Sequence, residues 1–198
     1  METKFPFFGS FVVTFYKMPI RDWEYFRRSH IIYIVNRDAH FLEYKVRVHF
    51  MVKILGKYEF PEDLYYYPRH TWARIENGKV RVGIDDWGQQ ALGRAIAIRV
   101  LPVGRFVEQG KPLAVVESGK WRGTLYSPVS GKIVEVNEKL VKEKRVELLN
   151  EDPYGEGWIA VIEPTNLEED LKNLIHGAEN IEKWIIEDEE KLKRGELK

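Results

Sequence analysis

The stretch Val115-Val-Glu-Ser-Gly-Lys-Trp-Arg-Gly-Thr-Leu-Tyr-Ser-Pro-Val-Ser-Gly-Lys-Ile-Val-Glu-Val-Asn137 sets the architecture of this chain. Residues 113–117 and 124–126 have the composition of strands, and they flank a turn in which glycines bracket Lys120. Because glycine permits the positive φ angles of a tight turn, these residues predict a β-hairpin. We therefore expect Lys120 at a hairpin tip, away from any core.

Short strands separated by turn residues continue on both sides of this hairpin. Residues 72–75 and 79–84 flank Asn77-Gly78, a pair that strongly favours a two-residue hairpin turn. A second hairpin turn is expected at 127–131, with a strand over 132–137 after it. Another apolar strand is expected over 158–162. Regular short strands punctuated by Gly and Pro are typical of a compact sandwich or barrel, so the predicted fold class is mainly β.

Helices are expected after the first hairpin and at the C-terminus. Asp85 or Asp86 can cap a short helix that Gly93 ends. The segment 165–168 has the form of a capping box, from which a helix would run to Gly177. Residues 178–193 follow as a second helix, and we expect both C-terminal helices to pack on the β domain. The apolar side of the second helix consists of Ile181, Trp184, Ile185 and Leu192.

Length and composition limit the classes of function. A chain of 198 residues can bury one good core. Its 31 basic and 31 acidic residues balance, which gives no electrostatic reason to expect a nucleic acid or an anionic membrane as a partner. Cysteine is absent, which excludes disulfides, thiolate metal sites and a cysteine nucleophile. We expect a cytoplasmic protein.

The first 50 residues differ from the rest of the chain. Residues 44–50 alternate apolar and polar side chains and predict one amphipathic strand. The apolar run 5–16 is shorter than the ~20 residues that a transmembrane helix needs. We interpret 1–50 as an added segment or as upstream sequence read from a wrongly chosen start, 51–164 as the main domain and 165–198 as its C-terminal helices. The histidines of this region lack metal-ligand spacing, namely His30, His40 and His49.

Two motifs resemble the glycine cleavage system H-protein family, a family of lipoyl carriers. The first comprises 117–120 with the residues that follow it up to Asn137, and the second is the segment 150–158, Asn-Glu-Asp-Pro-Tyr-Gly-Glu-Gly-Trp. The resemblance extends from Tyr65 to Leu174. It implies a lipoyl/biotinyl-type barrel-sandwich hybrid of two small antiparallel sheets.

The resemblance also implies the site and the cofactor. By resemblance, Lys120 carries covalently bound lipoic acid, and Glu117 helps to present that lysine to the lipoylating enzyme. Biotin carriers have methionine on both sides of the lysine, whereas this chain has Gly119 and Trp121 there. The implied partners are glycine decarboxylase, aminomethyltransferase and dihydrolipoyl dehydrogenase. The chain itself would be a carrier of an aminomethyl group and of the dithiol rather than an enzyme.

Three positions depart from the polar cleft in which the family shelters this cationic cargo. Thr71 stands where the family has the glutamate of its His-Glu-Trp motif, and Thr124 stands where it has an aspartate. Trp87 stands where many members have histidine. Two charged contacts of roughly 1.5 kcal/mol each would correspond to about a hundredfold in cargo binding. The departures do not affect the expected attachment of the lipoyl group at Lys120, but they leave the identity of its cargo open.

Two other carrier functions therefore stay open beside glycine cleavage. One is an H-like lipoate-binding protein of a heterodisulfide-reductase-like sulfur-oxidation system, and the other is a lipoyl-relay protein. Lys120 would serve all three. An independent enzyme is disfavoured, because no serine lies in a Gly-x-Ser-x-Gly nucleophile elbow. The serines near the hairpins are explained by their role in turns. The side chains that could be proposed for catalysis are Ser118, Ser127 and Ser130 as nucleophiles, and His70 or His176 as bases.

Overall fold

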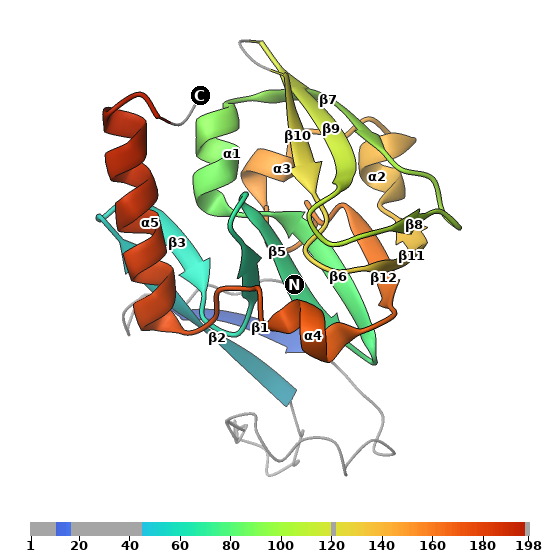
Figure 1. The fold of residues 1–198 in the computed structure, drawn as a ribbon, viewed down its shortest axis with the longest axis horizontal. Coiled ribbons are helices and arrows are strands. Elements are labelled where there is room, and N and C mark those ends of the chain that lie inside the picture. The colour runs from blue at the N-terminus through green and yellow to red at the C-terminus, as the bar shows by residue number, and fades with distance from the viewer. Residues whose placement is uncertain (1–10, 17–44, 120–121, 197–198) are drawn as a thin grey trace, which may run out of the picture. The chain divides into compact units, whose positions relative to one another are not determined.

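The fold is seen in a computed structural model that describes residues 11–16, 45–119 and 122–196. The chain divides into two compact units, residues 1–51 and 52–198 (Figure 1). No helix among the described residues is long and apolar enough to cross a membrane.

The described part of the first unit consists of two paired strands. Strand β1 (Phe11–Tyr16) pairs antiparallel with β2 (Lys45–Ile54), so that Phe11 lies opposite Phe50 and Tyr16 opposite Lys45. Of the strand predicted over 44–50, residues 45–50 are confirmed as strand, and Tyr44 lies outside the described residues. His30 and His40 lie outside the described residues.

A six-stranded antiparallel sheet forms one side of the second unit. Strands β5 (Thr71–Glu76) and β6 (Lys79–Ile84) form a hairpin that turns at Asn77-Gly78, where the φ angles are 50° and 75°. The predicted hairpin is confirmed. Strand β12 (Ala160–Pro164) begins two residues later than the strand predicted over 158–162. The strand β3 (Tyr58–Pro61) precedes the sheet. In spatial order the sheet consists of β4 (Tyr65–Tyr67), β5 (Thr71–Glu76), β6 (Lys79–Ile84), β12 (Ala160–Pro164), β11 (Gly131–Val136) and β8 (Phe106–Val107).

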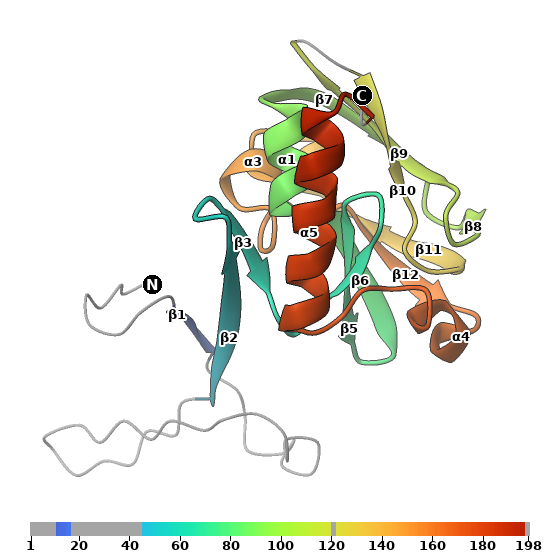
Figure 2. The ribbon, with the colours of Figure 1, turned by 60° about the vertical axis from the view of Figure 1, so that its left-hand side comes forward.

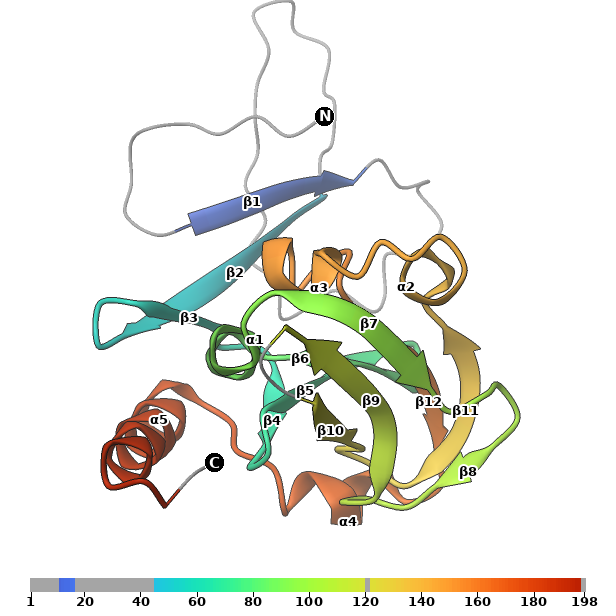
Figure 3. The same cartoon turned by 90° about the horizontal axis from the view of Figure 1, so that it is seen from above.

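A smaller antiparallel sheet covers the other side of the core. Its order is β10 (Arg122–Tyr126), β9 (Pro112–Ser118) and β7 (Ala95–Val100). Figure 3 shows this sheet lying over the strands of the larger one. The two sheets enclose a buried apolar core, and the mainly β prediction is confirmed. Members of this core come from both sheets, including Val82, Val116, Leu125, Ile133 and Ile162.

The second predicted hairpin is wrong. Strand β11 pairs with β12 and β8 in the larger sheet, whereas β10 belongs to the smaller one. Residues 127–130 therefore carry the chain from one sheet to the other. The turn chemistry is present, since the Ser127 hydroxyl donates to the Val129 carbonyl oxygen at 2.7 Å. Turn residues indicate a change of direction, but the pairing partner of β11 is set by distant residues.

The first helix forms as predicted. The Asp85 side chain caps α1 (Asp86–Leu92) by accepting from the Gly88 backbone N–H at 2.7 Å. Gly93, with φ of 74°, ends it. Two single-turn helices, α2 (Glu138–Val141) and α3 (Leu148–Glu151), were not expected.

The C-terminal helices differ in part from the prediction. Helix α4 (Leu167–Leu171) has Asn166 at its N-cap position with no side-chain cap hydrogen bond, and the Thr165 hydroxyl donates to the Ser130 carbonyl oxygen at 3.3 Å. The capping box is therefore absent. Residue Gly177 begins α5 (Ala178–Lys193) rather than ending α4, and its φ of 85° suits glycine.

Helix α5 lies alongside α1, as the views of Figures 1 and 2 agree. Ile181, Trp184 and Ile185 on its inner side are buried, whereas Leu192, on the same helical face near the C-terminal end of α5, is 44% exposed. These buried side chains join a second apolar cluster beneath the helix. The cluster also contains Tyr58, Phe60, Leu64, Tyr66, Trp72 and Trp87.

Candidate functional site

The hairpin β9–β10 forms the first part of the site. Glu117 lies opposite Arg122, and Val115 lies opposite Thr124, in an antiparallel register. The two strands predicted here are confirmed. Lys120 and Trp121 of the intervening turn lie outside the described residues. The role of Lys120 in carrying lipoic acid thus stays a prediction.

The last described residues of β9 suit a modified lysine beside them. The Glu117 carboxylate Oε1 lies 3.4 Å from Nε of Arg122, with 32% of the Glu117 side chain exposed. Gly119 is exposed, and a Cβ built on it would meet no heavy atom within 4 Å. This end of the hairpin is uncrowded, so its residues fit a group attached covalently to the next residue in the chain.

One of the threonines at the departed cleft positions, Thr124, lies on β10, and the other, Thr71, is hydrogen-bonded to that strand. Thr71 is fully buried at the start of β5, and its hydroxyl donates to the Tyr126 carbonyl oxygen of β10 at 2.9 Å. Thr124 lies two residues before Tyr126 on the same strand and is half-buried. The guanidinium of Arg69 lies 4.4 Å from the centre of the Tyr126 ring. This region therefore carries a fixed positive charge and a hydroxyl that is already engaged.

Trp87, the third departed position, lies on α1 and contacts His70, the residue before Thr71. Its ring is buried on α1, and its indole Nε1 donates to Oε1 of Glu189 at 3.2 Å. It also stacks on His70, with the ring centres 4.0 Å apart. The structure thus places Trp87 in a cluster that joins α1 to α5.

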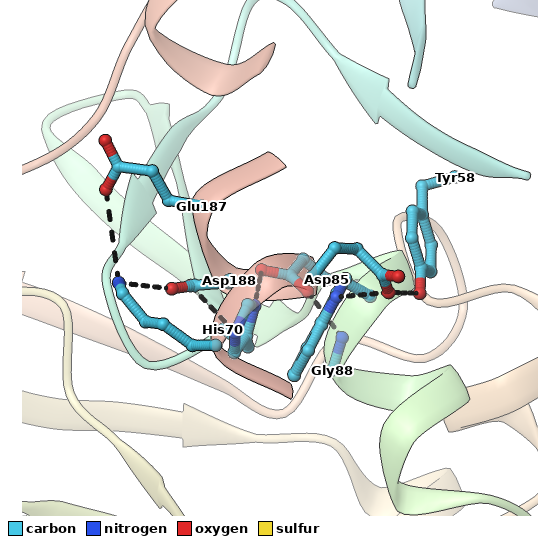
Figure 4. Close-up of polar contacts among 9 residues, drawn as sticks. Tyr58, His70, Asp85, Gly88, Glu187 and Asp188 are labelled. Atoms are coloured by element: carbon cyan, nitrogen blue, oxygen red, sulfur yellow. Dashed lines mark hydrogen bonds and ion pairs between the residues drawn. The ribbon is translucent and has the colours of Figure 1, made fainter. Parts of the chain in front are cut away.

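His70 is the centre of that cluster, which we call the His70 cluster (Figure 4). It consists of His70, Trp87, Trp184 and three carboxylates, those of Asp85, Asp188 and Glu189. Nδ1 of His70 lies 3.2 Å from Oδ2 of Asp85, and Nε2 lies 3.5 Å from Oδ2 of Asp188. The ring lies between two indoles, since Trp184 also stacks on it at 5.0 Å.

This environment keeps His70 positively charged. Burial alone would lower the pKa of His70, but the adjacent carboxylates of Asp85 and Asp188 outweigh it and raise the pKa to about 9. The imidazolium donates both ring N–H groups to carboxylates. It therefore ties the turn between β4 and β5 to the start of α1 and to α5.

Glu189 anchors the same helix through three donors. It accepts hydrogen bonds from the Tyr58 hydroxyl, from Lys57 Nζ at 3.1 Å and from Trp87 Nε1 at 3.2 Å. The hydrogen bond from Tyr58 is the largest influence, and together with Lys57 it holds the pKa of Glu189 below its usual range despite burial. Asp188 and Glu189 are thus both engaged with the core.

The His70 cluster was missed in the sequence, although one signal existed. Residues 181, 184, 185, 188 and 189 follow the spacing of one helical face. The first three are apolar and buried, so the acidic pair that continues the face is expected to be buried and paired as well. Its partners come from segments far away in the chain and could not be read locally.

The side chains considered for catalysis have other contacts. The Ser130 hydroxyl accepts from the Gln109 backbone N–H at 2.9 Å, and His176 Nδ1 lies 3.0 Å from the Leu64 carbonyl oxygen. Within the described ranges, no three or more His, Asp or Glu side chains are grouped so that they could hold a metal ion.

Comparison with known proteins gives one consistent result. The family model described as "Glycine cleavage H-protein" matches residues 64–188. The chain is 48% identical over 125 residues to "Glycine cleavage system H protein 2" of Aquifex aeolicus, covering 62% of this chain and 76% of that protein. It is 48% identical over 109 residues to "Glycine cleavage system H protein" of Thermus thermophilus, covering 55% and 84%.

A solved structure agrees with the sequence relatives. The crystal structure of a glycine cleavage system H protein from Mycobacterium marinum superposes with a TM-score of 0.54 at 34% identity, and the match covers 61% of this chain and 95% of that chain. The predicted barrel-sandwich fold is thereby confirmed.

Proposed function

The chain belongs to the glycine cleavage H-protein family, and on that basis we propose that it is a cytoplasmic lipoyl carrier and not itself an enzyme. Lipoic acid bound to Lys120 would supply a cyclic disulfide that is reduced as it accepts a one-carbon unit, and that is left as a dithiol once the unit has been passed on. The carrier receives an aminomethyl group from glycine decarboxylase, delivers it to aminomethyltransferase, and presents its dithiol to dihydrolipoyl dehydrogenase. A lipoylating enzyme must first load it.

One observation supports this proposal most strongly. Glu117 lies in register opposite Arg122 at the end of an uncrowded hairpin, and the turn that follows contains Lys120. The half-exposed carboxylate of Glu117 is available to a loading enzyme. Gly119 leaves space beside the lysine, since a Cβ built on it would meet no heavy atom of the described residues within 4 Å. The rigid pairing of β9 with β10 and β7 holds these residues in one place.

The test is reconstitution with glycine decarboxylase. The lipoylated chain, glycine and the pyridoxal-phosphate enzyme are expected to release CO₂ in an amount proportional to the lipoylated chain. Lys120→Arg removes the attachment amine and should abolish the release, whereas Lys111→Arg, at the other end of β9, should leave it unchanged. Absence of CO₂ release with fully lipoylated chain would contradict a role in glycine cleavage.

A second candidate is an H-like lipoate-binding protein of a heterodisulfide-reductase-like sulfur-oxidation system. The hydroxyl of Thr71 is engaged by the Tyr126 carbonyl, and Arg69 adds positive charge at Tyr126, so this region is poorly suited to a cationic aminomethyl group. A chain that is lipoylated, inactive with glycine decarboxylase and loaded with sulfur by such a system would establish this second function. Transfer of lipoate onward to other proteins would instead identify a lipoyl relay.

A further inference from the structure

Strand β7 carries a β-bulge beside the end of the hairpin. Ala95 lies opposite Ser118 of β9 and Ala97 lies opposite Glu117, so Ile96 is the extra residue between two paired positions. A bulge re-aims the side chain that it carries. Ile96 is 58% exposed, which is the largest exposed fraction among the large apolar side chains of residues 50–119 and 122–196.

The bulge lies where the three strands of the smaller sheet end together. Strand β9 is central, with β7 on one side and β10 on the other. Ile96 of β7 therefore lies beside Glu117 of β9, and Arg122 of β10 lies on the far side of Glu117. An apolar side chain, a carboxylate and a guanidinium thus neighbour one another next to the turn that contains Lys120.

Ile96 offers apolar surface to a partner that approaches this end of the hairpin. Edge strands such as β7 are usually protected from pairing with another chain by charged side chains or by their short length. An exposed isoleucine gives no such protection. Its apolar surface contributes free energy only when another surface covers it. The ion pair of Glu117 with Arg122 at 3.4 Å is solvent-accessible, because 63% of the Arg122 side chain is exposed, and a partner's cation can replace that contact.

We propose that Ile96 extends the docking surface for the enzyme that acylates Lys120, beside Glu117, whose part in that surface the family resemblance already implies. This inference rests on the proposed carrier function. An acylating enzyme must bring the lysine amine itself into its active site, so it must touch the end of the hairpin. The later partners meet the far end of the arm and have no such requirement. The matching surface is an apolar pocket for Ile96 beside a cationic group for Glu117.

The covalent step at this surface needs only ATP and lipoate. ATP and the lipoate carboxylate give lipoyl adenylate and pyrophosphate. The amine of Lys120 then attacks the acyl carbon, the C–N amide bond forms as the C–O bond to AMP breaks, AMP leaves with that electron pair, and the amine loses one proton to solvent. Nothing is oxidised or reduced.

The experiment measures the initial rate of lipoylation of the full chain by intact mass, with lipoate, ATP and a lipoate–protein ligase, over a range of chain concentrations. Ile96→Ser is expected to lower kcat/KM about fivefold to tenfold through a higher KM, the factor for losing burial of roughly half an isoleucine side chain. Ile96→Leu keeps the apolar contact and should restore the rate to within about twofold.

The matched control is Ile75→Ser, which changes an isoleucine that is 39% exposed on β5 of the other sheet. Equal thermal midpoints of the three variants and the parent chain would show that folding is unaffected. An unchanged KM for Ile96→Ser, or an equal loss in Ile75→Ser, overturns the docking surface while leaving the carrier function intact. Failure of the parent chain to be acylated at Lys120 overturns both.

Discussion

Nε2 of His70 lies 3.5 Å from Oδ2 of Asp188, which places a buried imidazolium against the C-terminal helix α5. The other ring nitrogen faces Asp85 at the start of α1. One side chain therefore links the strand turn at residue 70, the first helix and the last helix. The charge of this histidine therefore contributes to the attachment of α5 to the domain.

Stability should consequently fall as pH rises from 6.5 to about 9. The pKa of His70 is raised from 6.5 to about 9 in the folded chain by Asp85 and Asp188, against the effect of burial. Below 6.5 both states are protonated and the contribution is complete, and above about 9 it is lost, a change of up to roughly 3 kcal/mol. Urea unfolding at pH 6 and pH 9.5 measures it. His70→Asn should be less stable at pH 6 and should lose this pH dependence. If the free energy of unfolding fell equally between pH 6 and pH 9.5 in the parent chain and in His70→Asn, the assignment to His70 would be contradicted.

Removing the charge of Glu189 should loosen α5. Glu189→Gln leaves three donors facing a weaker acceptor, and we expect the free energy of unfolding to drop by about 1–3 kcal/mol. The control is Glu190→Gln, the adjacent residue, whose side chain is 61% exposed and whose contribution should stay within about 0.5 kcal/mol. Denaturant titration compares the two. Equal effects would show that Glu189 does not anchor the helix.

The hydroxyl of Thr71 should be needed for stability rather than for cargo. Thr71→Val removes the hydrogen bond to the Tyr126 carbonyl oxygen and leaves that acceptor without its present donor, at a cost of about 1–2 kcal/mol. Thr71→Ser retains the hydroxyl and should be closer to the parent chain. Thermal unfolding distinguishes them, and a valine variant as stable as the serine variant would refute the role of this bond.

Two glycines should respond oppositely to alanine. At Gly131 a Cβ would collide with the backbone carbonyl oxygen of Glu163 on β12, so Gly131→Ala should cost about 1–3 kcal/mol. At Gly119 nothing lies within 4 Å, so Gly119→Ala should change stability by less than about 0.5 kcal/mol. Urea unfolding of both variants checks this. A tolerant Gly131 would mean that β11 and β12 do not approach so closely.

Features set by neighbouring residues were predictable from the sequence, and those set by distant residues were not. The Asn77-Gly78 turn and the Asp85 cap depend on a few adjacent residues, and both were predicted correctly. The pairing of β11 with β12, in which Ile133 lies opposite Ile162, depends on residues far apart, so local turn chemistry pointed to the wrong strand.

The site divides in the same way. The hairpin with Glu117 could be placed because its strands and turn are contiguous. The environment of Trp87 could not, because its partners His70 and Glu189 come from other parts of the chain. The resemblance in sequence implies a cleft position for Trp87, and the structure adds its stacking on His70 and its hydrogen bond to Glu189 of α5.

The central claim is that Lys120 carries a lipoyl group, and the intact mass of the natively expressed chain tests it most directly. We predict a mass increase of one lipoyl group that disappears in Lys120→Arg and persists in the control Lys111→Arg. An unmodified chain from cells that make lipoate, or a modification that persists in Lys120→Arg, would contradict the account.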